Sequence, residues 1–155
     1  FDVREAGRVK RIGHPVLGEV EKDANGEPIR IPGTLKHVKA IGWYIEEYQI
    51  AQISMNLTKY TETPLHIAFD EVCKSADKRG LRVTGSELVG LVPLNALLEA
   101  GRFFLKKQGR SIGVSDKELI HIAVKSMGLD ELAPFVPEKK IIEYLLDNKQ
   151  EKKLI

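Results

Sequence analysis

Residues 50–58 read Ile-Ala-Gln-Ile-Ser-Met-Asn-Leu-Thr, in which apolar and polar side chains alternate. Successive side chains of a β-strand point to opposite faces, so this alternation predicts a strand with one apolar face and one hydrogen-bonding face. The hydrogen-bonding face would carry Gln52, Ser54 and Asn56. A solvated sheet face and a polar binding face both explain this row, and the two interpretations stay open.

Residues 37–45 alternate in the same way and predict a second strand, which would pair with the first. Matching the two apolar faces places Trp43 opposite Ala51 or the neighbour of Ala51 on the same side of the strand. This register requires a connection with an odd number of residues, because a slip of one residue exchanges the faces. The small side chains of Ala40 and Gly42 would then lie beside the polar row and leave space above it.

A helix is predicted after the strand pair, with Thr63 as its N-cap, Pro64 as its first residue and Gly80 at its end. Its apolar side chains recur at helical spacing and form one stripe: Leu65, Ala68, Phe69, Val72, Cys73 and Ala76. The stripe predicts a helix that packs against the sheet.

Three further helices are predicted near the C-terminus. The first begins at Pro93. The second begins at Ser115, which forms a capping box with Glu118, and ends at Gly128. The last begins at Pro137.

The remaining segments complete the order of elements. Residues 1–11 predict the end of a helix, 12–32 an exposed loop, 81–84 a short strand and 147–155 a charged tail. With one strand added before Phe1, the order becomes β-α-β-β-α-β, which is the split βαβ arrangement. We therefore expect an α+β fold: a ferredoxin-like, open-faced antiparallel sheet with helices on one face and additional C-terminal helices.

Composition excludes several classes of protein. The net charge of +2 gives no reason to expect a nucleic-acid partner, and no apolar run reaches the length of a membrane helix. Cys73 is the only cysteine, which excludes an internal disulfide and favours a cytoplasmic protein. The sequence begins with Phe1 rather than Met, which predicts a processed or partial product.

Few side chains have the spacing of a metal site or a catalytic site. The histidines lie far apart and give no metal-ligand pattern: His14, His37, His66 and His121. Of these, His66 would lie in the first turn of a helix, where the dipole disfavours its charged form, and it is either structural or adjacent to a ligand. Trp43 could stack on a flat ligand or pack in the core.

The segment Gly85-Ser86-Glu87 is the second candidate site. Gly85 and Gly90 have the spacing of a phosphate-binding loop, but no Lys-Ser or Lys-Thr pair follows, so that interpretation fails. A turn capped by Ser86 and a ligand-positioning loop containing Glu87 both remain open.

Several longer strings resemble one family. They are Gly33-Thr34-Leu35-Lys36, Ala40-Ile41-Gly42-Trp43-Tyr44, Ala51-Gln52-Ile53-Ser54-Met55-Asn56-Leu57, Thr84-Gly85-Ser86-Glu87-Leu88-Val89-Gly90-Leu91-Val92-Pro93, Gly128-Leu129-Asp130, Pro134-Phe135 and Ile141-Ile142-Glu143-Tyr144. Over residues 33–146 the sequence is similar to the C-terminal subdomain of glutamate formimidoyltransferase, also called formiminotransferase. Residues 1–146 would form this subdomain.

The resemblance implies an enzyme of histidine degradation that transfers a formimidoyl group from N-formimidoyl-L-glutamate to tetrahydrofolate, the co-substrate. It also implies a homodimer and a folate tunnel between two subdomains, with the catalytic histidine on the N-terminal one. No catalytic residue and no metal are then expected here, and the fragment alone would be inactive. The expected folate or substrate contacts are Gln52, Ser54, Asn56, Gly85, Ser86 and Glu87, with His66 and Trp43 adjacent to the ligand. The alternative is a ferredoxin-like dimerisation module that binds no folate.

Overall fold

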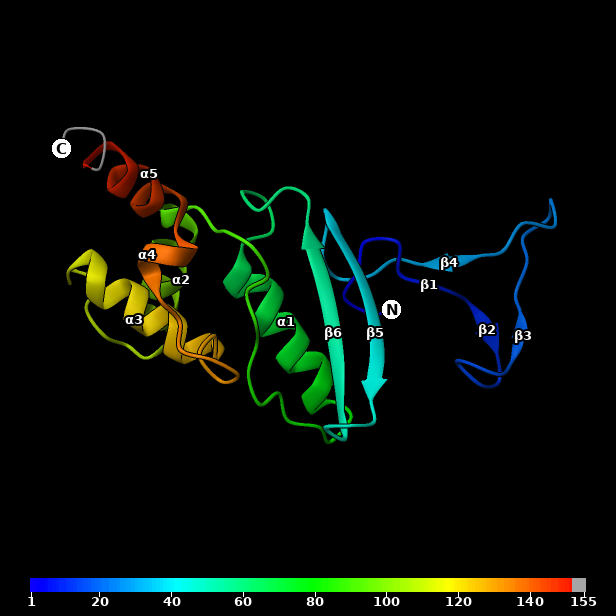
Figure 1. The fold of residues 1–155 in the computed structure, drawn as a ribbon. Helices are drawn as coiled ribbons and strands as arrows, with labels where there is room; N and C mark the ends of the chain where they lie inside the picture. The colour runs from blue at the N-terminus through cyan, green and yellow to red at the C-terminus, as the bar shows by residue number, and fades with distance from the viewer. Residues whose placement is uncertain (152–155) are drawn as a thin grey trace. The chain divides into compact units, whose positions relative to one another are not determined.

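The computed structural model describes residues 1–151, with side chains described up to residue 147. The chain divides into two compact units, Phe1–Arg79 and Gly80–Ile155, and each is described by itself (Figure 1).

The first unit is built on an antiparallel ribbon of two strands, β5 (Val38–Ile45) and β6 (Ile50–Leu57). Helix α1 (Leu65–Asp77) runs alongside this ribbon (Figure 1). The buried apolar side chains come from the N-terminal segment, the start of β5 and α1: Val3, Leu35, Val38, Ala68 and Val72. The apolar stripe predicted for α1 therefore does supply part of this core.

The start of α1 differs from the prediction. The N-cap is Pro64, and no side chain caps it. The Thr63 hydroxyl instead donates a hydrogen bond of 2.6 Å to the carbonyl oxygen of Lys36, and Thr63 is buried. A long-range partner has replaced the local cap, and this bond fastens the start of α1 to the segment that enters β5.

The N-terminal region forms two short ribbons, not the helix predicted for residues 1–11. Strands β1 (Arg8–Val9) and β4 (Arg30–Ile31) pair, as do β2 (Arg11–Ile12) and β3 (Glu19–Val20). Gly7 has a φ of 54°, and a Cβ at this position would lie 1.9 Å from the carbonyl oxygen of Ile31. A segment of eleven residues is too short for its sequence pattern alone to identify a helix, and here strand pairing determines the backbone conformation.

The second unit is mainly helical. Its helices are α2 (Leu94–Lys107), α3 (Asp116–Met127), α4 (Pro137–Lys140) and α5 (Ile142–Glu151). Helices α2 and α3 cross closely, since a Cβ on Gly101 would lie 2.3 Å from the carbonyl oxygen of Leu119. The predicted limits of α3 are confirmed: Ser115 accepts a hydrogen bond from the Glu118 N–H, and Gly128 ends the helix at a φ of 59°.

The single last helix predicted from Pro137 is wrong, because it is interrupted at Ile141. This residue has extended backbone angles, is 0% exposed and forms a parallel bridge with Val92. The Val92 N–H donates to the carbonyl oxygen of Lys140, and the Ile142 N–H donates to that of Val92. The helix is interrupted here because burying the Ile141 side chain and forming the bridge to Val92 stabilise the fold more than a continuous helix would. Residues 152–155 of the predicted tail lie outside the described residues.

The chain is thus a mixed α+β protein with small antiparallel sheets. Each sheet among the described residues has two strands. Residues 81–84 form no strand, which corrects the expected order of elements. Leu81 is 60% exposed, and a pattern suited to a strand does not form one without a partner strand.

Candidate functional site: the open face of the β5–β6 ribbon

The register of the ribbon decides which side chains share a face. Trp43 lies opposite Gln52, Ile41 opposite Ser54, and Lys39 opposite Asn56. Residues directly opposite each other in an antiparallel pair project from the same face. We call the face formed by Lys39, Ile41, Trp43, Gln52, Ser54 and Asn56 the open face.

This register corrects the prediction by one residue. Trp43 was expected opposite Ala51 or its neighbour on the same side, with an odd number of residues in the connection. The structure connects the strands through residues 46–49, an even number, with Gln49 at a φ of 50°. The polar row therefore shares its face with Trp43 and Ile41, not with the small side chains of Ala40 and Gly42.

Burial separates the two faces at the end of the ribbon where the core lies. Val38 is 2% exposed, and its neighbours on that face, Ala40, Met55 and Leu57, are half-buried. On the open face, Ile41 is 64% exposed and Trp43 45%, while Gln52 is half-buried. The open face thus combines an exposed indole with amide and hydroxyl groups, which suits a flat ligand that also forms hydrogen bonds.

His66 belongs to the interior of the first unit rather than to the open face. It lies in the first turn of α1 and is 7% exposed. Near the ribbon, His37 forms an ion pair, with its Nε2 2.9 Å from Glu62 Oε2. The Lys59 ammonium, hydrogen-bonded to Glu62, lowers the pKa of that carboxyl, and His37 lowers it further.

The Gly85-Ser86-Glu87 segment lies in the second unit, where it packs against the end of α3. The Ser86 hydroxyl donates a 2.6 Å hydrogen bond to the carbonyl oxygen of Met127, and the Ser86 N–H donates to that of Gly128 at 3.0 Å. These carbonyl groups lie at a helix end, where no further helical N–H can reach them. Ser86 therefore has a structural role, because it satisfies carbonyl groups at the end of α3. The side chain of Glu87 is exposed.

The close approach explains why residue 85 is glycine. A Cβ at this position would lie 2.6 Å from Glu131 Cβ and 3.1 Å from the carbonyl oxygen of Gly128. No local pattern marks this contact, because the partner segment comes more than forty residues later in the chain.

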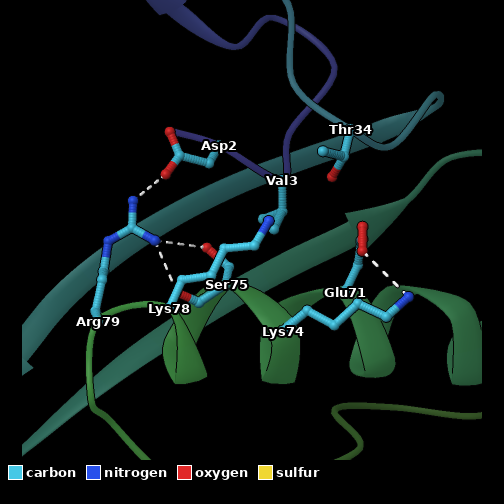
Figure 2. A pocket seen from close by; sticks show the side chains of 8 residues that line it. All are labelled: Asp2, Val3, Thr34, Glu71, Lys74, Ser75, Lys78 and Arg79. Atoms are coloured by element: carbon cyan, nitrogen blue, oxygen red, sulfur yellow. Dashed lines mark hydrogen bonds and ion pairs between the residues drawn. The ribbon is translucent and has the colours of Figure 1, made fainter.

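A pocket of about 430 Å³ in the first unit contains none of the predicted site residues (Figure 2). It lies between residues near the N-terminus and the C-terminal half of α1. Arg79 forms an ion pair with Asp2 and donates to the carbonyl oxygen and the hydroxyl of Ser75, at 2.7 and 3.0 Å. Lys74 lies 3.5 Å from Glu71, and nearby carboxylates, Asp70 foremost, raise its pKa. The Arg79–Asp2 ion pair joins the N-terminal segment to the end of α1, whereas Lys74 and its carboxylates all lie within the helix.

Among the described residues, the structure has neither a metal-binding cluster nor a membrane-spanning helix. No group of three or more potential ligands among them could hold a metal ion. Within the same part of the chain, no helix has both the length and the apolar character needed to cross a bilayer.

The fold and the open face define a small α+β module with a candidate ligand-binding surface. Comparison with known proteins identifies the family: the formiminotransferase domain model matches residues 1–147. The chain belongs to the formiminotransferase domain family.

The relatives include two animal proteins and one archaeal protein. The formimidoyltransferase-cyclodeaminase of Gallus gallus is 43% identical over 144 residues, which cover 93% of this chain and 26% of the relative. That of Sus scrofa is 49% identical over 115 residues, covering 74% and 21%. The glutamate formimidoyltransferase of Thermoplasma acidophilum is 38% identical over 77 residues, covering 50% and 25%. The chain thus spans about a quarter of the length of these relatives.

Proposed function

We propose that this chain is the folate-binding C-terminal subdomain of a glutamate formimidoyltransferase. The complete enzyme would transfer a formimidoyl group from N-formimidoyl-L-glutamate to tetrahydrofolate in histidine degradation. Family membership and the names of the relatives support the transferase class. The structural observation that carries the proposal is the open face, where Trp43 lies opposite Gln52 and beside Ile41 and Ser54.

The chain would bind and orient rather than catalyse. In the reaction, a nitrogen of tetrahydrofolate attacks the amidine carbon, and the glutamate nitrogen leaves with a proton. Holding the two substrates in the right geometry is itself a large part of catalysis. The acid and base would come from an N-terminal formiminotransferase subdomain, since no histidine or carboxylate is among the residues of the open face.

The proposal extends to the surroundings of the site. The open face would form one wall of a folate tunnel, with Gln52, Ser54 and Asn56 donating and accepting hydrogen bonds. His66 would support this wall from within the first unit, and Gly85, Ser86 and Glu87 are proposed separately as folate or substrate contacts of the second unit. We also propose that β5 and β6 belong to a larger ferredoxin-like sheet in a homodimeric, cytoplasmic enzyme.

Calorimetric titration with tetrahydrofolate under anaerobic conditions tests this function. The titration is run on the chain alone and on the chain together with the N-terminal subdomain. We expect binding to be tight only when both are present, and transferase activity to be absent from the chain alone. Failure of both preparations to bind, or turnover by the chain alone, would contradict the proposal.

A second function has one observation in its favour. The open face exposes 64% of Ile41 and 45% of Trp43, and exposed apolar residues on a sheet also suit a protein interface. In this alternative, two copies of the chain dimerise through the open face and no folate binds. Sedimentation of the chain alone distinguishes the two, because Trp43→Ser would dissociate such a dimer.

A further inference from the structure

We propose that the open face fixes the direction in which tetrahydrofolate binds: the ring system on Trp43 and the glutamate carboxylates on Lys39. This inference rests on the proposed function. It adds to it a binding residue, Lys39, and an orientation for the ligand.

The open face changes in character along the ribbon. The Trp43–Gln52 pair lies nearer the turn that connects the strands, followed by Ile41–Ser54 and then Lys39–Asn56. One end therefore offers an aromatic surface beside an amide, and the other end offers a cation beside an amide. A ligand with a flat ring at one end and carboxylates at the other complements this order.

The distance between Trp43 and Lys39 also agrees with the length of the ligand. Trp43 and Lys39 are four residues apart on one strand, and a strand rises about 3.3 Å per residue, which separates their Cα atoms by about 13 Å. In tetrahydrofolate, the aminobenzoyl spacer separates the ring system from the glutamate by a comparable length. The spacer would lie across Ile41, whose side chain is 64% exposed and apolar.

Lys39 is suited to bind a carboxylate. Its side chain is exposed, and it forms no ion pair with any carboxylate among the described side chains. A charge-assisted hydrogen bond from an ammonium to a carboxylate is roughly twice as strong as one between neutral groups. The orientation places this interaction at one end of the ligand only.

The test compares 5-formyltetrahydrofolate with the primary amide of 5-formyltetrahydropteroate (the pteroate below), which lacks the glutamate and carries no free carboxylate. Affinities are measured calorimetrically with the N-terminal subdomain present. We expect Lys39→Gln to weaken the folate about tenfold and to leave the pteroate unchanged. Trp43→Leu should weaken both ligands about fivefold. Lys39→Arg should restore most of the folate affinity, and Lys36→Gln, an exposed lysine outside the open face, is the charge-matched control.

The possible failures are distinct. If neither ligand binds the unaltered protein, the proposed function itself is wrong. If both ligands bind but Lys39→Gln weakens them equally or not at all, the orientation is overturned while folate binding stands. If Lys39→Gln raises only the KM for N-formimidoyl-L-glutamate, the carboxylate belongs to the other substrate, and the orientation is again overturned.

Discussion

Trp43 lies directly opposite Gln52 across the β5–β6 ribbon, so the indole and the carboxamide project from the same face. This pairing places an aromatic surface and a hydrogen-bonding group side by side without any third element. It makes the open face of the ribbon a candidate binding surface, and its individual side chains can be tested.

Replacing Gln52 should weaken ligand binding without unfolding the chain. Gln52→Leu keeps the side chain similar in size but removes its hydrogen-bonding groups, and a lost hydrogen bond typically costs about 1 kcal/mol. We expect the affinity for 5-formyltetrahydrofolate to fall about fivefold in calorimetric titrations with the N-terminal subdomain present. Ala51→Ser is the matched control, because Ala51 lies on the opposite face of the same strand. An equal loss in both variants would show that the face of the ribbon does not matter.

The close contact between Gly85 and the end of α3 predicts a steric cost at that position. In Gly85→Ala the new Cβ would lie 2.6 Å from Glu131 Cβ, so the backbone or Glu131 must move. Overpacking of this kind costs about 1–3 kcal/mol, which thermal unfolding should register as a lower Tm. Gly113→Ala is the control, since the nearest atom to its Cβ would be Ser111 Oγ at 3.5 Å. A Tm for Gly85→Ala as high as that of the control would contradict the packing described for Ser86 and α3.

Sequence periodicity predicted the elements whose signals are local. The Ser115 cap and the Gly128 end of α3 were correct, because capping depends on residues within one turn of each other. The polar row of β6 was also recognised. Its register was wrong by one residue, since register depends on the turn at residues 46–49 and not on the alternation alone.

Predictions that depended on distant partners failed or lacked a signal. Residues 1–11 form no helix, because Val3 lies in the core and residues from Arg8 onward pair as strands. Residues 81–84 have no strand partner among the described residues. The contact of Ser86 with Met127 joins segments 41 residues apart, and no local pattern marks it. These are cases in which tertiary contacts prevail over local preference.

The ion pairs of Glu62 predict a loss of stability in acid. Hydrogen bonding to Lys59, and secondly the interaction with His37, lower the pKa of Glu62 below its usual value of 4.5. A carboxyl with a lowered pKa in the folded state stabilises the fold above its unfolded-state pKa, and this contribution disappears as the pH falls through the folded-state value. The Tm should therefore fall below about pH 4.5, and the fall should be shallower in Glu62→Gln. The control is Glu47→Gln, an exposed carboxyl in the connection between β5 and β6. An identical acid profile for Glu62→Gln and the unaltered chain would contradict the role of this cluster.

The interruption at Ile141 predicts a strong dependence of the second unit on one side chain. Ile141 is 0% exposed and is held between Lys140 and Ile142, whose backbone groups both bond to Val92. Removing most of such a buried side chain leaves a cavity, and Ile141→Ala should lower the free energy of unfolding by about 2–5 kcal/mol. Chemical denaturation followed by circular dichroism measures this change. The neighbouring Ile142→Ala is the matched control, because Ile142 is 36% exposed and should cost clearly less. Equal losses at the two positions would indicate a continuous helix through residue 141, in which the bridge to Val92 contributes nothing.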